Sequence, residues 1–430
     1  MPKLKNKIQP KPKPDAVYFK SLTIRDIKCF RGEHTIDLSD GKGAYAQWTV
    51  ILGNNNTGKT TILKCLAGLE AELSYSEYSP KGWTDAGKNA EVNSELLLKY
   101  RRQSINRLYS NFWGYQYKRM TIVLSRMGET KKQEIKNEEV KNLLIEPYGA
   151  SRRMSAVSLS SEQAKERHAN LFQNSDLPNV EEWYLQLTLA KMQGENDVRK
   201  KAKIISDKID EILTSGLLPD VKSIKFNTEQ QGQTFNNFIE FQTDFGWIRL
   251  RDLGYGYQTM LAWVLDLVRR MFERYPESPN PIREPAIVLV DEIDLHLHPE
   301  WQRKIIAHLT QYFPKTQFIV TAHSPLVVQS AEKINLVLLE KEGDHVNITQ
   351  KKIQTYKGWT LEEILTELMG LDERIHSDVY LELIGKFDKA LEDDNFEAAQ
   401  AAYDELDKIL HPQSNQRKLL RLQMSSLTPA

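Results

Sequence analysis

Eight consecutive residues carry the clearest chemistry in this sequence. They fit the pattern G-x-x-x-x-G-K-[ST], which wraps the phosphates of a nucleotide, and they are Gly53, Asn54, Asn55, Asn56, Thr57, Gly58, Lys59 and Thr60. In such a loop the backbone N–H groups cradle phosphate oxygens, the lysine reaches the β- and γ-phosphates, and the final hydroxyl binds Mg²⁺. We therefore assign Lys59 to the phosphates, Thr60 to Mg²⁺, and the whole loop with the adjacent Thr61 to ATP.

The segments that flank this loop have the structure that the pattern requires. Trp48–Leu52 is a continuous apolar run typical of a buried parallel strand, and Thr61–Ala67 has the composition of a helix. This order of strand, loop and helix favours a phosphate-binding loop over an ordinary glycine-rich turn.

A second apolar run ends in two carboxylates. Residues 287–290 read Ile-Val-Leu-Val, which predicts a buried strand, and Asp291 and Glu292 follow at once. A carboxylate at the end of such a strand can complete the Mg²⁺ shell, and a second one can orient or deprotonate the attacking water. We assign Asp291 to the metal and Glu292 to the water.

A third apolar run, Phe318–Ala322, ends at His323. A histidine at this point can contact the γ-phosphate of a bound nucleotide, and the alternative is a surface histidine at a strand end. Between the two runs, His296 and His298 suggest either a loop that reaches a neighbouring subunit or a metal site. The metal interpretation is the weaker one because no third ligand of suitable spacing stands nearby.

Length and composition set broad limits. The chain has 430 residues, enough for two or three domains, and its 58 basic residues balance 58 acidic ones. Cys29 and Cys65 are its only cysteines, which argues against a disulfide scaffold or a cysteine zinc site. No apolar run approaches the roughly 20 residues that span a bilayer. Met1–Pro14 alternates Lys and Pro without an apolar core, so we expect a solvated tail and a cytoplasmic protein without a membrane partner.

The patterns along the chain predict five regions. Phe19–Leu38 alternates like two antiparallel strands, residues 68–117 look irregular, and Val180–Gly216 is helical in period. The expected regions are a disordered basic tail (1–16), an N-terminal ATPase lobe with a basic and aromatic insertion (17–150), a mainly helical insertion (151–245), a C-terminal ATPase lobe (246–355) and an acidic helical region (356–430).

Two segments have a strong local charge. Leu96–Met120 contains six basic and no acidic residues, together with several aromatic ones, which is compatible with binding DNA phosphates and bases or with a solvated face. Trp359–His411 contains 15 acidic and 4 basic residues on amphipathic helices. Their apolar faces could dock a partner or pack on the ATPase body.

The order of these motifs resembles that of the ABC-type ATPases. Lys59, Leu253–Gln258, Asp291-Glu292 and His323 occur in the order of that superfamily, and Leu22–Gly32 and Asp294–Pro299 resemble its RecF/SMC-like branch. The resemblance implies an α/β fold, namely a P-loop NTPase of ABC/SMC-head type with a mixed sheet, a helical insertion and a C-terminal helical extension.

The resemblance also implies how ATP is held. In this superfamily a signature loop of one subunit closes over ATP bound to the other, so a homodimer or higher homo-oligomer is expected. The matching loop positions are Gly254, Tyr255, Gly256 and Gln258, with Gly254 in place of the usual serine. Arg31 stands where related ATPases place an arginine beside the phosphates. No glutamine fits the Q-loop, for which Ser151-Arg152 is the alternative.

Most of the chain resembles the PtuA ATPase subunits of Septu-type antiviral defence systems and their retron-associated relatives. Leu253–Trp263 and the acidic tail ending at His411-Pro412 carry this resemblance. In that family the ATPase assembles with a separate small HNH nuclease (PtuB-like), and the pair degrades nucleic acid. The resemblance therefore implies an ATP-hydrolysing sensor or regulatory subunit of such a complex. The sequence past residue 330 shows no TOPRIM arrangement of its own, and a stand-alone RecF/SMC-like DNA-binding repair ATPase is the alternative.

Overall fold

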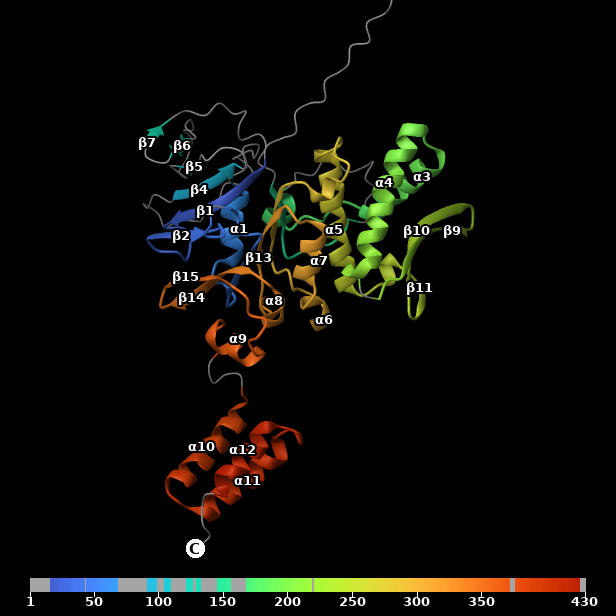
Figure 1. Ribbon diagram of the computed structural model, residues 1–430. Coiled ribbons are helices and arrows are strands. Elements are labelled where there is room, and N and C mark those ends of the chain that lie inside the picture. The colour runs from blue at the N-terminus through green and yellow to red at the C-terminus, as the bar shows by residue number, and fades with distance from the viewer. Residues whose placement is uncertain are drawn as a thin grey trace, which may run out of the picture. The chain divides into compact units, whose positions relative to one another are not determined.

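The computed structural model describes residues 16–42, 44–68, 91–98, 104–109, 121–126, 129–132, 145–155, 168–218, 220–371 and 376–425. They form two compact units, which divide between Trp359 and Thr360. Figure 1 shows the elements of each unit.

The first unit contains strands and helices, and the second unit is helical. The strands are β1 (Val17–Arg25), β2 (Glu33–Asp37), β3 (Trp48–Gly53), β4 (Glu91–Leu98), β5 (Ser104–Tyr109), β6 (Thr121–Arg126), β7 (Glu129–Lys132), β8 (Ile145–Tyr148), β9 (Ser223–Gln231), β10 (Thr234–Thr243), β11 (Gly246–Arg249), β12 (Ala286–Val290), β13 (Thr316–Thr321), β14 (Ile334–Glu342) and β15 (His345–Gln354). The α-helices are α1 (Lys59–Ala67), α2 (Ala169–Gln173), α3 (Val180–Gln193), α4 (Asn196–Ile212), α5 (Tyr255–Arg274), α6 (Pro299–Gln302), α7 (Ile305–Tyr312), α8 (Pro325–Ser330), α9 (Leu361–Glu367), α10 (Asp378–Glu392), α11 (Phe396–Ile409) and α12 (Asn415–Met424). Shorter turns are the π-helix η1 (Leu213–Leu217) and the 3₁₀-helices η2 (Leu250–Asp252) and η3 (Pro281–Arg283).

A mixed sheet with the order β15-β14-β3-β13-β12-β8 forms the centre of the first unit. Its strands run parallel except for β15, which is antiparallel to β14. All residues of β12 and β13 are buried, as expected for parallel strands that are covered on both faces. Because β3, β13, β12 and β8 are parallel, their carboxyl ends meet at one edge, where α/β proteins bind ligands.

A second sheet, with the order β2-β1-β4-β5-β6-β7, is antiparallel throughout. The predicted pair of strands in Phe19–Leu38 is confirmed as β1 and β2. Phe19 and Leu22 of β1 share one hydrophobic core with Ile51 of β3 and Leu289 of β12. Strands β4 and β5 lie in the segment that looked irregular in sequence, so that expectation was wrong there.

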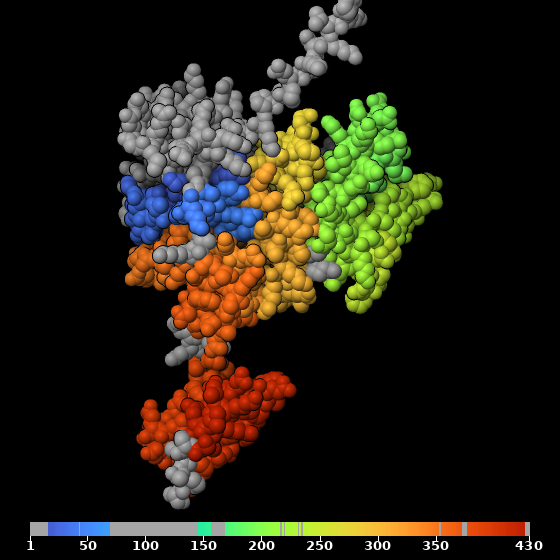
Figure 2. Space-filling view, viewed as in Figure 1, coloured from blue at the N-terminus to red at the C-terminus, as the bar shows by residue number. Residues whose placement is uncertain are grey.

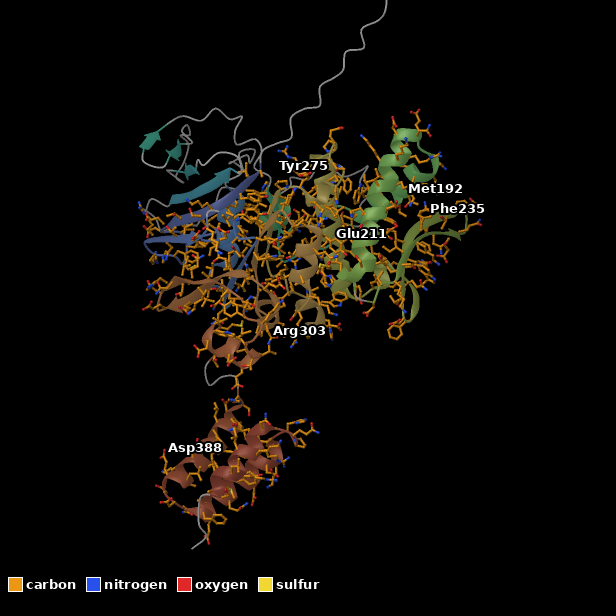
Figure 3. The ribbon with its side chains drawn as sticks, viewed as in Figure 1. Met192, Glu211, Phe235, Tyr275, Arg303 and Asp388 are labelled. Carbon is orange, nitrogen blue, oxygen red and sulfur yellow. The ribbon has the colours of Figure 1, made fainter. Side chains whose placement is uncertain are left out.

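The segment between the two halves of the nucleotide motifs contains helices and a small sheet. Helices α3 and α4 lie side by side, and β9, β10 and β11 form a three-stranded antiparallel sheet. In Figure 2 these elements, coloured green, gather in one region of the first unit. Met192 of α3 and Phe235 of β10 are exposed here, with exposed fractions of 63% and 67% (Figure 3).

The second unit has a core of its own. Phe387 of α10, Ala399 and Leu406 of α11 and Leu420 of α12 are buried together. The helical period that predicted this region is therefore confirmed. The predicted α/β architecture with a mixed sheet and a C-terminal helical extension is also confirmed.

Candidate nucleotide site

The predicted phosphate-binding loop connects β3 to α1. Gly58, the N-cap of α1, has a φ of 91°, and a Cβ there would lie 2.7 Å from the ring of Phe30. Only glycine therefore fits between the loop and the segment that carries Phe30. The loop leaves the N-terminal N–H groups of α1 facing outward from the end of the helix, the arrangement that binds phosphate.

Lys59 folds back over this loop. Its ammonium donates to the carbonyl oxygens of Gly53 and Asn54 at 2.8 and 2.9 Å. Burial lowers the pKa of Lys59, while the carboxylates of Asp291, Glu292 and Asp294 act in the opposite direction. Three acidic groups thus act electrostatically on Lys59, and a phosphate bound to this lysine would lie near the same groups.

Thr60, Asp291 and Thr321 come from three neighbouring elements and meet at the sheet edge. The Thr60 hydroxyl donates to Asp291 Oδ2 at 2.7 Å, and the Thr321 hydroxyl donates to Oδ1 at 2.7 Å. Asp291 is buried, with an exposed fraction of 4%. A hydroxyl and a carboxylate are oxygen ligands of the kind that Mg²⁺ prefers, so this pair of side chains fits that ion.

Glu292 is the second residue after β12 and has an unusual backbone conformation. Its φ is 50°, the left-handed region, which costs a non-glycine residue about 1–3 kcal/mol and requires support from its surroundings. Its N–H donates to Thr321 Oγ1 at 2.7 Å, and its carbonyl accepts from Arg152 Nη2 at 2.9 Å. The backbone at Glu292 is thus held from both sides.

His323 lies two residues after the end of β13, at the end of the predicted apolar run. Its backbone N–H donates to the carboxylate of Asp294 at 3.0 and 3.3 Å. The strand register places Val320 opposite Val290, so the polar ends of β13 and β12 are neighbours. His323 therefore lies at the same edge as Asp291 and Glu292.

The predicted signature loop forms the start of α5. A Cβ at Gly256 would lie 2.3 Å from the carbonyl oxygen of His296, and the Tyr255 ring meets the His296 ring edge-on with centroids 4.7 Å apart. Gln258 donates to the carbonyl oxygens of Arg251 and Leu253. Gly254 is the N-cap of the helix. The signature turn therefore packs against the loop that follows Glu292 in the same chain.

Within the described ranges, no hydrogen bond, ion pair or ring contact joins residues 254–258 to residues 53–61. Tyr255 is 44% exposed. The signature turn and the phosphate loop of one chain therefore make none of these interactions with each other.

Arg31 lies in the segment that covers the phosphate loop. Two residues earlier, Cys29 Sγ donates to the carbonyl oxygen of Thr57 at 3.6 Å. A hydrogen bond from His345 lowers the pKa of Asp344, and the charge of Arg31 contributes in the same direction. The assignment of Arg31 to the phosphates stays a prediction.

The two histidines after Glu292 have separate roles in the structure. His296 contacts Tyr255, and the Nδ1 atom of His298 accepts from the N–H of Glu300 at the start of α6. Among the residues that the structure describes, no group of three or more His, Cys, Asp or Glu side chains could hold a metal ion.

A buried ionic cluster ties α5 to β8. Asp266 of α5, fully buried, pairs with Arg269 at 2.8 Å and with Arg270 at 2.6 Å, and Arg270 also lies 3.3 Å from Glu146 of β8. Burial alone would raise the pKa of Asp266, but Arg270 and Arg269 outweigh it and hold that pKa below its usual value. Tyr148 of β8 donates to Asp266 at 3.2 Å.

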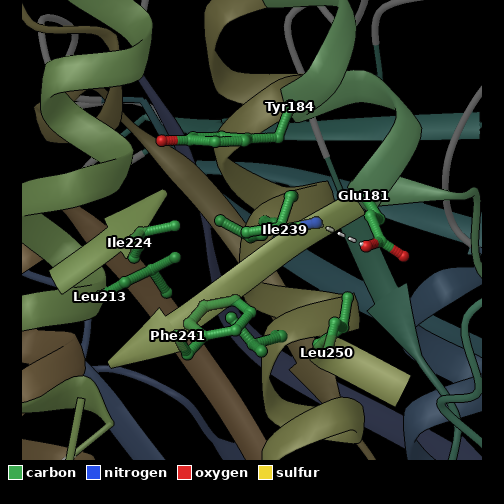
Figure 4. A pocket seen from close by; sticks show the side chains of 9 residues that line it. Glu181, Tyr184, Leu213, Ile224, Ile239, Phe241 and Leu250 are labelled. Carbon is green, nitrogen blue, oxygen red and sulfur yellow. Dashed lines mark hydrogen bonds between the residues drawn. The ribbon is translucent and has the colours of Figure 1, made fainter. Parts of the chain in front are cut away.

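A small apolar pocket lies between α3, β10 and α5 (Figure 4). Glu181 at its rim accepts a hydrogen bond from the N–H of Ile239 at 3.1 Å. Burial raises the pKa of Glu181. None of the predicted site residues lines this pocket, so it is separate from the nucleotide site.

Sequence reasoning did not assign a role to Thr321, and it considered Arg152 only as a Q-loop alternative. Thr321 could have been found because it is the polar residue that closes an apolar strand just before His323. Arg152 offered no such signal, since its contacts lie 139 and 140 residues away in sequence.

The family model that matches this chain is described as "AAA domain, putative AbiEii toxin, Type IV TA system" and covers residues 122–329. A Septu protein PtuA from Bacillus thuringiensis is 36% identical over 208 residues, which are 47% of this chain and 52% of that protein. A Septu protein PtuA from Bacillus mycoides is 28% identical over 81% of this chain and 44% of its own length. An Escherichia coli protein named "Retron Ec83 probable ATPase" is 38% identical over 31% of this chain and 24% of its own length.

The chain thus spans about half the length of the first two relatives. Among solved structures, an Smc head bound to a domain of ScpA covers 78% of this chain and 97% of its own, at 18% identity and a TM-score of 0.46. The recombination mediator RecF covers 78% of this chain and 99% of its own, at 10% identity and a TM-score of 0.42. The predicted resemblance to PtuA and retron-associated ATPases is confirmed.

In the part of the chain that the structure describes, no helix has both the length and the apolar character that crossing a bilayer requires.

Proposed function

We propose that this chain binds Mg-ATP between two subunits and hydrolyses it. The observation that carries the proposal is the meeting of Thr60, Asp291 and Thr321 at the carboxyl edge of the parallel sheet. This edge also holds Lys59 and Glu292, which gives one site a phosphate-binding cation, a metal-binding oxygen pair and a carboxylate for the water.

In this mechanism Lys59 exchanges its two carbonyl partners in the loop for phosphate oxygens. Thr60 and Asp291 would hold Mg²⁺, whose positive charge would offset the negative charge that develops on the phosphates. Glu292 orients the attacking water and takes its proton, while His323 contacts the γ-phosphate.

The second subunit completes the site in our proposal. Tyr255 is exposed, and Gly254, Gly256 and Gln258 form the turn at the start of the 20-residue helix α5. The N-terminus of such a helix favours an anion, so this turn can face the triphosphate bound to the partner subunit.

We further propose that the ATPase is the sensor or regulatory subunit of a Septu-like antiviral defence complex and controls a separate HNH nuclease. Relatives named Septu protein PtuA, which align over 47% and 81% of this chain, support this proposal. Nucleic acid would then be the substrate of the complex rather than of this chain alone. The basic region that favours a stand-alone DNA-binding ATPase lies largely outside the described residues.

The test is ATP binding and hydrolysis by the purified chain. We expect Lys59→Ala to abolish binding of a fluorescent ATP analogue, and Glu292→Gln to bind ATP, to stop hydrolysis and to accumulate as a dimer in size-exclusion chromatography with light scattering. The matched control is Glu300→Gln, an exposed glutamate eight residues further on, paired with Lys304. Hydrolysis by Glu292→Gln at the wild-type rate would refute the assignment of the base.

A further inference from the structure

Arg152 is a buried cation whose partners are backbone oxygens rather than side chains. It is only 2% exposed. Its guanidinium donates to the carbonyl oxygens of Gly149 at 3.0 Å, of Asp291 and of Glu292 at 2.9 Å. Three donors of one planar group thus bridge the end of β8 and the turn that follows β12.

This arrangement supports a turn whose backbone conformation is energetically costly. Glu292 has a left-handed backbone, with a φ of 50°. A hydrogen bond to a charged donor is roughly twice as strong as one between neutral groups, so Arg152 is suited to offset the cost of that conformation. Thr321 fixes the N–H side of the same residue.

The segment that carries Arg152 is itself rigidly held. The side chain of Asn170 accepts from the N–H of Gly149 at 2.6 Å and donates to the carbonyl oxygen of Ser151 at 2.8 Å. A Cβ at Gly149 would lie 2.6 Å from the carbonyl oxygen of Asn170, so the two backbones are in close contact. The guanidinium therefore projects from a fixed support.

We propose that Arg152 is a positioning residue for ATP hydrolysis: it holds the peptide groups of Asp291 and Glu292 so that the Glu292 carboxylate points at the attacking water. A Q-loop residue would instead touch the nucleotide or its metal. The guanidinium of Arg152 is directed at the Asp291–Glu292 backbone and is closed off from solvent, so it acts through Glu292. This inference rests on the proposed ATP hydrolysis at the same site.

The experiment compares Arg152→Lys, the wild type and a neighbouring control. Lysine keeps the charge but lacks the planar fork that bridges three carbonyls. We expect Arg152→Lys to lower kcat about 10- to 100-fold, the scale for a misplaced catalytic group, while the dissociation constant for ATP changes less than about twofold. The control is Arg153→Ala, which removes a side chain that is 61% exposed and pairs with Asp176 at 3.5 Å. Its kcat should stay at the wild-type value.

A double-mutant cycle separates positioning from general stability. In a Glu292→Asp background, which keeps a carboxylate and should leave a slow but measurable hydrolysis, single-turnover assays with radiolabelled ATP should show less than about a twofold further effect of Arg152→Lys, because the two residues act as one unit. Effects that multiply instead would overturn the proposal, as would wild-type kcat in Arg152→Lys.

Two outcomes have distinct meanings. If the wild type itself does not hydrolyse ATP, the proposed function fails and this inference with it. If the wild type is active but neither Arg152→Lys nor Arg152→Gln gives a cooperative melting transition, Arg152 is a stability residue and the positioning role is wrong.

Discussion

The Thr60 hydroxyl donates a 2.7 Å hydrogen bond to the Asp291 carboxylate across 231 residues of sequence. The parallel strands β3, β13 and β12 bring the two together, since β13 pairs with both of its neighbours. An oxygen pair in this position can bind Mg²⁺ without a large rearrangement.

Replacing Thr60 by valine should therefore weaken the response to metal more than the binding of nucleotide. The substitution keeps the shape and removes one oxygen, so we expect the Mg²⁺ concentration for half-maximal hydrolysis to rise by about 10-fold or more. A titration of ATPase rate against free Mg²⁺ measures this. Thr366→Val in α9 serves as the control, and equal curves for both variants would contradict the assignment.

Gly256→Ala should uncouple binding from hydrolysis. The new Cβ would lie 2.3 Å from the backbone oxygen of His296, so the turn or the loop must shift. We expect a loss of ATPase activity of about 10-fold or more, with nucleotide binding by the loop at Lys59 preserved. Gly254→Ala is the control for folding, because its nearest neighbour is the Tyr257 side chain at 3.8 Å and its melting temperature should equal that of the wild type. Unaltered hydrolysis by Gly256→Ala would show that this close contact is dispensable.

The sequence could predict those parts of the site in which a short motif directly follows a recognisable apolar strand. Gly53–Thr60 and the pair Asp291-Glu292 each follow an apolar strand, so strand ends alone predict that they share an edge. Thr321 also ends an apolar strand and could have been assigned in this way, whereas Arg152 could not. The contacts of Arg152 are with backbone oxygens of a distant turn, and backbone atoms leave no mark in a sequence.

Strands β4 and β5 show a second reason for a missed prediction. Strand β4 pairs with β1, which lies far upstream, so its pairing is decided by tertiary contacts more than by local pattern, and β5 joins the sheet by pairing with β4 and β6. The helices of the second unit were easier to predict, because the amphipathic spacing of apolar residues in α10 and α11 itself indicates a helix.

The second unit should lose local stability at acidic pH through Asp407. Hydrogen bonds from Arg417 and Tyr403 lower the pKa of Asp407 to about 2, below its ordinary value of 3.8. A carboxyl group whose pKa is lowered by folding stabilises the folded state at pH values above its ordinary pKa. This contribution disappears as the pH falls from about 4 to about 2. Asp407→Asn should therefore increase amide exchange in α11 and α12 at pH 7, with a smaller difference at pH 3.

Hydrogen exchange of the full chain, corrected for the intrinsic rate at each pH, measures this effect. The control is Asp404→Asn on the same helix, where the carboxylate accepts only from Gln400 among the described contacts. Equal protection of α11 in both variants at pH 7 would refute the role of Asp407.

If this chain controls a separate HNH nuclease as proposed, a chain that ends at Trp359 should no longer bind that nuclease. We expect the acidic second unit to provide the docking surface, so co-expressed HNH nuclease should no longer be captured, while ATP hydrolysis by the first unit persists. A milder variant, Glu397→Lys with Asp404→Lys, reverses two exposed charges on one face of α11 and should reduce capture as well. Undiminished capture by the truncated chain would remove the second unit from the proposal.

The contact of Gly256 with His296 has a consequence for how such a site can evolve. The turn at the start of α5 and the segment after Glu292 are in close contact, so a substitution in one of them constrains which residues the other can accept. Substitutions that damage one should be rescued by second-site suppressors in the other, and a screen for restored ATP hydrolysis should find such suppressors there.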